Sequence, residues 1–213
     1  NKYLCKNLIG FSFSEYADTE FSFADFERKN RKCSAEDDTF FASLKLDFDN
    51  LGDFFGNVTQ LDVRKKTSIA LASVIENAVA STKGAYPIFV GGDDIFLLLK
   101  DCNYPKIINT LYRNLRDGIE KAEELSLYRP IFGISGGMSI IRNDLGKVPL
   151  FYYSELAEEQ LEIAKATKNK NSISINKTGL SWDQIFALAE VTEHHMDKIL
   201  DGMDENRRLI ILS

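Results

Sequence analysis

Few residues of this chain belong to the types that build disulfide frameworks or zinc sites. Its 213 residues include three cysteines, no Cys-x-x-Cys pair and two histidines, the neighbouring His194 and His195. Adjacent residues on a helix point in different directions, so we do not expect the histidines to share a metal ion. Three cysteines leave one unpaired if two form a disulfide, and we therefore expect reduced thiols with a structural role.

Long apolar runs and an excess of positive charge are also absent. No run approaches the roughly 20 residues that a membrane-spanning helix requires, and no signal-peptide pattern opens the chain, so we expect a cytoplasmic protein with no membrane partner. The formal net charge of -6 argues against broad, nonspecific binding to nucleic acid, which usually requires a basic face. Any contact with nucleic acid is expected to be local or shared with partners. The hydrophobic content of 44% is sufficient for a large core.

Residues 1–39 are typical of a linker or N-terminal segment rather than of a domain. They combine scattered phenylalanines with a mixed-charge run at 27–32 and acids at 36–38. A basic run flanked by aromatic residues is compatible with RNA binding, but we favour a solvated turn or helix face. The chain starts without a methionine and stops after an apolar stretch, so we expect it to be a piece of something longer.

The stretch Tyr86–Leu99 consists of two apolar, strand-like runs joined by Gly91, Gly92, Asp93 and Asp94. Glycine adopts positive φ without steric cost, which suits a tight turn and lets phosphates approach the backbone. The pattern predicts a β-hairpin with two carboxylates at its tip. Adjacent carboxylates repel each other unless a cation lies beside them, and a divalent metal ion is the obvious candidate.

A second motif precedes the hairpin. The run Phe40–Asp47 predicts a strand that ends on a carboxylate, and ligands are often bound at strand ends. The following turn, Asp49–Phe55, is rich in Asp, Asn and Gly. Its exposed backbone N–H groups are suited to holding phosphates.

The rest of the chain alternates helical and strand patterns. Helical spacing places Leu61 and Ile69 on the buried face of the helix that follows the turn. The run Ser135–Gly137 predicts a bulge or a close approach within a strand, against which a ligand could lie, and Ser181 is placed to cap the last helix. The expected elements are helices at 58–80, 105–125, 152–168 and 181–200 and strands at 131–141 and 171–176.

This order of elements predicts an α+β fold, with a ferredoxin-like and largely antiparallel sheet covered by helices on one face and a C-terminal helical extension. In that arrangement the first strand lies beside the hairpin, which brings Asp47 together with Asp93 and Asp94. Such a trio is typical of the palm used in nucleotidyl transfer. Two Mg²⁺ (or Mn²⁺) ions bridge the carboxylates of such a palm, one activating a ribose 3′-hydroxyl and the other binding the triphosphate. Aspartates suit this role because they are ionised at neutral pH.

Four motifs in this order resemble the catalytic GGDD palm, the second palm, of the large polymerase-like subunit of type III CRISPR effector complexes. The motifs lie at residues 46–52, 89–94, 134–137 and 164–173, and the resemblance covers about residues 40–176. That palm is a relative of the GGDEF diguanylate cyclases and class III adenylyl cyclases. The resemblance implies a prokaryotic antiviral enzyme that converts ATP to cyclic oligoadenylate when its complex binds target RNA. It also implies guide RNA and other effector subunits as partners.

The resemblance assigns the metal ligands residue by residue. Asp47, Asp93 and Asp94 match the metal-binding carboxylates of the family, which are also its catalytic residues. Phe48 would contribute its backbone carbonyl to the same metal site.

The resemblance also assigns nucleotide contacts. Lys165 and Lys168 match cations that contact the β- and γ-phosphates, although a favourable charge at a helix C-terminus explains each of them equally well. Ser135 matches a serine near the adenine, with a plain turn residue as the alternative. The expected phosphate-binding turns contain Asp49, Asn50, Leu51, Gly52, Asp53, Phe54, Phe55, Gly91 and Gly92.

The chain departs from the family in lacking an HD nuclease motif, a first palm and a zinc site. A cyclising enzyme needs an acceptor beside the donor, so we expect a second palm, from a missing N-terminal half or another copy, as a partner. The expected domains are a linker at 1–39, the GGDD palm at 40–178 and the start of a C-terminal helical domain at 179–213.

Two other functions remain open from the sequence. One is a GGDEF-type cyclic-dinucleotide cyclase, disfavoured because Asp94 replaces the usual Glu. The other is a non-catalytic assembly module of a ribonucleoprotein complex, whose hairpin merely packs against partner subunits.

Overall fold

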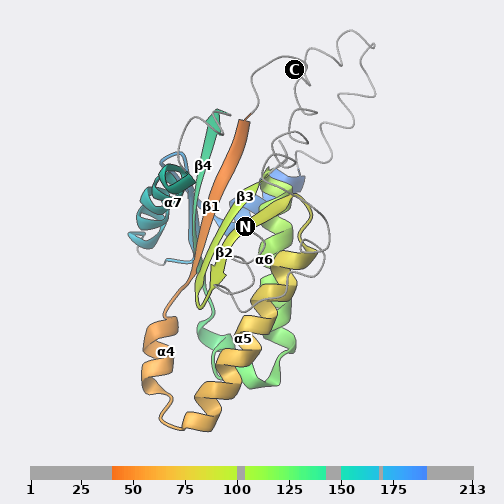
Figure 1. Ribbon diagram of the computed structural model, residues 1–213, viewed down its shortest axis with the longest axis vertical. Coiled ribbons are helices and arrows are strands. Elements are labelled where there is room, and N and C mark those ends of the chain that lie inside the picture. Colours follow the sequence, from red (N-terminus) through yellow and green to blue (C-terminus); the bar gives the residue numbers. More distant parts are fainter. Residues whose placement is uncertain (1–39, 100–103, 143–149, 168–169, 191–213) are drawn as a thin grey trace.

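The computed structural model describes residues 40–99, 104–142, 150–167 and 170–190 (Figure 1). Within these ranges six strands form one sheet in the order β2-β3-β1-β4-β5-β6. The strands are β1 (Phe40–Phe48), β2 (Ala85–Gly91), β3 (Asp94–Leu99), β4 (Ile134–Arg142), β5 (Ser172–Ile175) and β6 (Thr178–Ser181). The helices are α4 (Leu51–Asn57), α5 (Leu61–Ser81), α6 (Tyr104–Lys121) and α7 (Leu150–Lys165), with 3₁₀ turns η2 (Glu123–Leu125) and η3 (Arg129–Ile131). A further helix occupies 182–190.

The strand β1 lies in the middle of the sheet and is hydrogen-bonded on both sides. It pairs antiparallel with β3 and with β4. The prediction of a largely antiparallel sheet is confirmed, and the one parallel pair among the described strands is β4 with β5. These two strands run parallel because α7 carries the chain back across the sheet between them, as parallel pairing requires.

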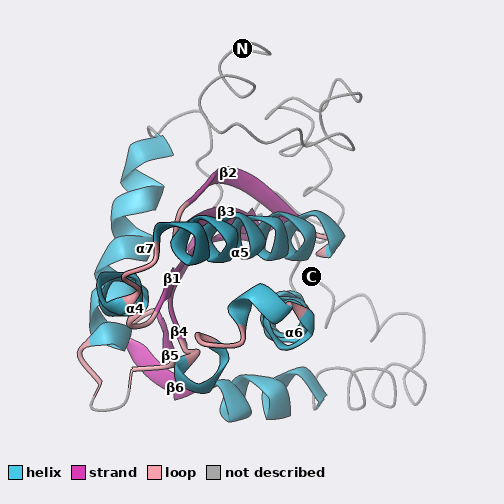
Figure 2. Ribbon diagram, turned by 90° about the horizontal axis from the view of Figure 1, so that it is seen from below, coloured by secondary structure: helices cyan, strands magenta, loops and turns pink. Residues whose placement is uncertain are grey.

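One face of the sheet holds the main apolar core. Alternate residues of β1 point to this face and are almost completely buried, as the period of a strand requires; they are Ala42, Leu44, Leu46 and Phe48. The helices α5 and α6 cover this side (Figure 2). Tyr112 of α6 stacks on Trp182 with ring centroids 4.4 Å apart, and the Trp182 indole N–H donates to the carbonyl of Ile134. The helix at 182–190 is therefore tied to the same core.

The opposite face is covered by α7, so the expectation of helices on one face is wrong (Figure 2). Buried serines point to α7 from the strands, and two of them donate to it. The hydroxyl of Ser139 donates to the Leu156 carbonyl at 3.0 Å, and that of Ser174 donates to Gln160 Oε1 at 3.0 Å. Small polar side chains let the helix lie close to the sheet.

The close approach expected at Ser135–Gly137 is real, but its partner is α7. The register of β4 against β1 runs without interruption through this run, so there is no bulge. A Cβ added at Gly137 would overlap the backbone of Ala157 and Leu161. Gly137 is thus required where the helix backbone touches the strand.

Several element boundaries differ from those expected. The turn after β1 is largely the short helix α4, and β6 was not expected at all. Leu61 and Ile69 are 77% and 61% exposed. Leu61 begins α5, whose first turn extends beyond the end of the sheet (Figure 1). Ile69 lies on the outer side of the helix, because Thr67 and Leu71 on either side of it are buried. The cap at Ser181 is confirmed: its hydroxyl accepts from the Gln184 backbone N–H at 3.2 Å, while Gln184 Oε1 accepts from the Ser181 N–H at 2.8 Å. This is the reciprocal pattern of a capping box.

Some expectations fall outside the described residues: Lys168, the two histidines and the charged run at 27–32. Within the part of the chain that the structure describes, none of the helices has the length and apolar character needed to cross a membrane.

The contact at Gly137 makes a stability prediction. The variant Gly137→Ala forces a methyl group into the α7 backbone, which cannot move aside like a side chain, and we expect a loss of about 3 kcal/mol or more in the free energy of unfolding. Urea denaturation measures this loss. Gly179→Ala is the matched control, since a Cβ there meets nothing within 4 Å, and its effect is expected within about 0.5 kcal/mol. Equal effects of the two variants would contradict the assigned packing.

Candidate functional site

The aspartates of the two motifs lie at one end of adjacent strands. Asp47 of β1 is the register partner of Asp94, the first residue of β3. Asp93 lies in the turn between β2 and β3, where Gly92 has a φ of 65°. The predicted hairpin and its position beside β1 are therefore confirmed. Glycine meets the need for positive φ at this turn, which holds the two adjacent carboxylates on a rigid element.

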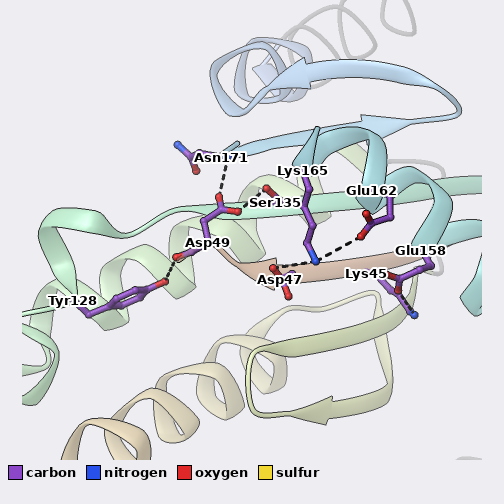
Figure 3. A network of polar contacts seen from close by, with 9 residues as sticks. All are labelled: Lys45, Asp47, Asp49, Tyr128, Ser135, Glu158, Glu162, Lys165 and Asn171. Carbon is purple, nitrogen blue, oxygen red and sulfur yellow. Dashed lines mark hydrogen bonds and ion pairs between the residues drawn. The ribbon is translucent and has the colours of Figure 1, made fainter. Parts of the chain in front are cut away.

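A cation from α7 reaches this group. Lys165 is the last residue of the helix, and its Nζ lies 3.3 Å from Asp47 Oδ2 (Figure 3). Glu162 Oε1 lies 3.9 Å from the same ammonium. Burial lowers the pKa of Lys165, but the carboxylates of Asp47, Glu162 and Glu158 outweigh burial and leave the pKa above its ordinary value. Lys165 is thus held as a cation at neutral pH.

The surroundings of Asp47 and Asp94 destabilise the ionised form of each carboxylate. Burial raises the pKa of Asp47, and the charges of Asp93 and Asp94 raise it further against the opposing effect of Lys165. Burial also raises the pKa of Asp94, with Asp93 and Glu158 as the main charges that add to it. The site therefore carries more negative charge than one lysine compensates, which favours binding of a further cation.

The carboxylate oxygens are the donors that a hard divalent cation prefers, and in this chemical respect the residues fit a metal ion. The separations are wider than those of a formed metal site. Within the described ranges, no group of three or more His, Cys, Asp or Glu side chains is close enough to hold a metal ion. The charges of the three aspartates interact, but the Asp47 carboxylate is engaged by Lys165.

Asp49 is a buried hub rather than an exposed turn residue. Its side chain is 3% exposed. Oδ1 accepts from the hydroxyl of Ser135 at 2.8 Å, and Oδ2 accepts from the backbone N–H of Asn171 at 2.8 Å (Figure 3). Its backbone N–H donates to Gly133, and its carbonyl accepts from the hydroxyl of Tyr128. Asp49 therefore ties the end of β1 to β4 and to the loop between α7 and β5.

The same hub accounts for Ser135, which the resemblance places near an adenine. Ser135 is completely buried, and its hydroxyl is engaged by Asp49. In the expected phosphate-binding turn, Asn50 precedes α4 with a φ of 60°. Gly52 and Asp53 are exposed, whereas Leu51 and Phe54 are buried in the core. The structure thus leaves only part of this turn accessible to a ligand.

Sequence reasoning missed a second ion pair beside the aspartates. Lys45 Nζ lies 2.6 Å from Glu158 Oε2, although 113 residues separate the two in the chain (Figure 3). The one local signal was the position of Lys45, two residues before Asp47 on the same face of β1. Its partner on α7 could not be inferred without the packing of that helix.

An α+β fold with carboxylates where β1 meets the β2-β3 hairpin is characteristic of the palm domains of nucleotidyl cyclases and polymerases. A family model described as the second palm domain of Cas10/Cmr2 matches residues 40–174. The chain therefore belongs to the Cas10/Cmr2 second palm domain family. A search of the curated proteins finds no match.

Solved structures share the fold. A Csm1–Csm4 subcomplex of the type III-A CRISPR-Csm interference complex has a TM-score of 0.55 at 15% identity, over 81% of this chain and 26% of the other. A Csm1–Csm4 cassette in complex with cA4 has 0.53 at 16%, and one in complex with one ATP has 0.51 at 15%; each match covers 79% of this chain and 26% of the other. The chain thus spans about a quarter of the length of these similar chains.

The Asp49 hub makes a second prediction. Asp49→Ala leaves the Ser135 hydroxyl and the Asn171 N–H without their buried acceptor, and we expect a loss of about 2–4 kcal/mol in the free energy of unfolding. Asp53→Ala removes an exposed carboxylate a few residues away and should cost no more than about 0.5 kcal/mol. Chemical denaturation of both variants checks this, and a mild effect at Asp49 would contradict its role as a hub.

The charge of Asp94 makes a third prediction, on pH dependence. Because its folded-state pKa is raised, ionisation of Asp94 opposes folding, and this cost is absent below the ordinary pKa of 3.8. Asp94→Asn should therefore unfold at a higher temperature than the wild type at pH 7 without metal. The two proteins should converge as the pH falls through the raised pKa to below 3.8. Asp117→Asn, on the exposed side of α6, is the control and should give no gain at pH 7; a lower unfolding temperature for Asp94→Asn would refute the argument.

Proposed function

We propose that this chain is a metal-dependent nucleotidyltransferase palm that converts ATP to cyclic oligoadenylate within an RNA-activated type III CRISPR complex. The observation that carries the proposal is the in-register pair of Asp47 and Asp94, with Asp93 in the adjoining turn, in a chain of the Cas10/Cmr2 second palm family. Support also comes from the similar Csm1–Csm4 chains, one of which was solved with ATP and another with cA4.

Asp47, Asp93 and Asp94, with the backbone carbonyl of Phe48, would hold Mg²⁺ or Mn²⁺. When bound, the metal supplies charge stabilisation for a transferring phosphoryl group and activates the attacking hydroxyl. The residues themselves provide the negative charge, and their raised pKa values mark the electrostatic cost that a cation would relieve.

Lys165 would bind the triphosphate together with Lys168 and the exposed part of the Asp49–Phe55 turn. Its ammonium is already at the site, 3.3 Å from Asp47. With a cation held by the carboxylates, the Lys165 ammonium would be repelled from Asp47 and attracted to the phosphates. In the proposed reaction Lys165 therefore exchanges a carboxylate partner for a phosphate partner. Gly92, where an added Cβ would meet nothing within 4 Å, leaves the backbone of the hairpin open to the phosphates, whereas the ring of Phe89 packs against Gly91.

The acceptor nucleotide would come from a second palm, either in a missing N-terminal half or in another copy. One set of metal-binding carboxylates, here Asp47, Asp93 and Asp94, serves one donor nucleotide. Guide RNA, target RNA and other effector subunits would act through the complex.

The test uses the complete type III complex that contains this chain, incubated with each NTP, Mg²⁺ and target RNA, with products identified by mass spectrometry. We expect cyclic oligoadenylate from ATP, and a fall of about a hundredfold or more when Asp93→Ala and Asp94→Ala are combined. Omission of the metal should have the same effect. Asp117→Ala, on the exposed side of α6, is the control and should leave the product profile unchanged.

Two outcomes would favour the other functions. Conversion of GTP rather than ATP would assign a cyclic-dinucleotide cyclase. An identical product profile from the wild type and the double variant would remove the catalytic assignment and favour an assembly module.

A further inference from the structure

Among the described residues, two ion pairs join α7 to β1, and the proposed reaction affects them differently. Lys165 Nζ lies 3.3 Å from Asp47 Oδ2, and Lys45 Nζ donates to Glu158 Oε2 at 2.6 Å (Figure 3). The proposed function takes Lys165 away from Asp47 when the triphosphate binds. The pair of Lys45 and Glu158 has no part in that exchange, so it still joins the helix to the strand afterwards.

The spacing of the two pairs relates the direction of Lys165 to that of Glu158. The two residues are seven positions apart on α7, which is close to two helical turns. Their side chains therefore leave the helix on the same side, about 10 Å apart along its axis. Lys45 and Asp47 likewise share one face of β1. The rotation of α7 that brings Glu158 to Lys45 thus also turns Lys165 towards Asp47.

The backbone contact at Gly137 brings α7 close to the sheet but offers no side chain that fixes this rotation. Lys45 is the register partner of Gly137, so the ion pair acts at the same level of the sheet. The Lys45 ammonium also lies 5.8 Å from the centre of the ring of Phe96, which is buried. A buried ring beside the lysine restricts where its ammonium can lie, and Glu158 therefore has a well-placed partner.

The other side of α7 is joined to the sheet by different contacts. Gln160 Oε1 accepts from the Ser174 hydroxyl at 3.0 Å and from the backbone N–H of Lys177. These bonds connect the helix to β5 and to the turn that follows it. On the side of the aspartates, the helix is joined to the sheet by Lys45 and Glu158 instead.

The pair is better suited to orienting the helix than to stabilising the fold. The side chains of Lys45 and Glu158 are 23% and 46% exposed, and exposed ion pairs contribute little to the free energy of unfolding. A small rotation of α7 is nevertheless sufficient to displace the ammonium of Lys165. Misplacement of a functional group by about 1 Å can cost roughly a hundredfold in rate.

We propose that Lys45 and Glu158 are positioning residues, which orient α7 so that Lys165 meets the triphosphate. The inference rests on the proposed function, because it requires Lys165 to bind phosphate at this site. It assigns no nucleotide contact to Lys45 or Glu158, since both act through the helix.

The experiment measures equilibrium binding of Mg·ATP to the full 213-residue chain by calorimetry. Lys45→Met and Glu158→Ala should each weaken binding about tenfold, because each releases the helix. The charges alone predict opposite effects, since Lys45 lowers the pKa of Asp94 whereas Glu158 raises it. Loss of the Glu158 charge would then favour the anionic nucleotide, and loss of the Lys45 charge would disfavour it. A loss of affinity in both variants therefore indicates positioning.

Two double variants test whether the pair acts through Lys165. Lys165→Met alone should weaken binding about thirtyfold through the lost phosphate contact, and Glu158→Ala should then have no further effect. Exchange of the two charges, Lys45→Glu with Glu158→Lys, should restore most of the affinity, because the ion pair forms again with reversed polarity. Glu159→Ala and Lys121→Met are exposed controls with the same charge changes and should bind like the wild type.

Thermal unfolding separates positioning from stability. The single variants of the pair should unfold within about 4 °C of the wild type, and a loss of affinity that accompanies a larger fall would assign a structural role instead. Opposite effects of Lys45→Met and Glu158→Ala would overturn the inference. An equal effect of Glu158→Ala with and without Lys165 would do the same.

The binding data also distinguish this inference from the proposed function. If Lys165→Met weakens Mg·ATP binding but Lys45→Met and Glu158→Ala match their controls, the positioning role alone is refuted. If Mg·ATP does not bind, or binds independently of Asp93 and Asp94, the proposed function fails and the positioning role fails with it.

Discussion

The close contact between α7 and the sheet at Gly137 is the constraint on which the rest of the site depends. A strand without a side chain at this point lets the backbone of the helix touch the backbone of β4. The serines around it are small enough for the same approach, and their hydroxyls bond to α7. Only at this distance does Lys165, at the end of α7, reach Asp47. The placement of the cation thus follows from packing two turns away.

Repulsion among the carboxylates of the site, together with their burial, makes the folded state less stable. The register of β1 against β3 brings Asp47 and Asp94 together, although their carboxylates carry like charges. Burial and mutual repulsion raise the pKa of both groups, and Lys165 offsets only part of this cost. Functional sites often keep such strain because it is relieved when the ligand binds. The carboxylate of Asp49 is more deeply buried than that of Asp47, and it accepts hydrogen bonds from the Ser135 hydroxyl and the Asn171 N–H.

Local patterns in the sequence were sufficient for the elements that carry the aspartates. The alternation before Asp47, the two glycines before Asp93 and the Ser181 cap each act within a few residues, and each was predicted correctly. The domain boundaries and the roles assigned to the individual site residues stay predictions.

What the sequence did not reveal depends on contacts between distant segments. The carboxylate of Asp49 bonds to a backbone N–H 122 residues away, and Lys45 pairs with a glutamate 113 residues away. The strand β6 is short and polar, and it forms because β5 offers it an edge. The helix α4 contains two glycines, which lower its intrinsic propensity, and it is held instead by the burial of Leu51 and Phe54.

The contact at Gly137 also determines how α7 can move. It meets the helix at Ala157 and Leu161, near the middle of its length. A tilt of α7 about this contact moves the two ends of the helix in opposite directions. Any force that presses on the Leu150 end would lift Lys165 away from the sheet or drive it further in. A partner could therefore act on the charge at Asp47 mechanically, without touching the site itself.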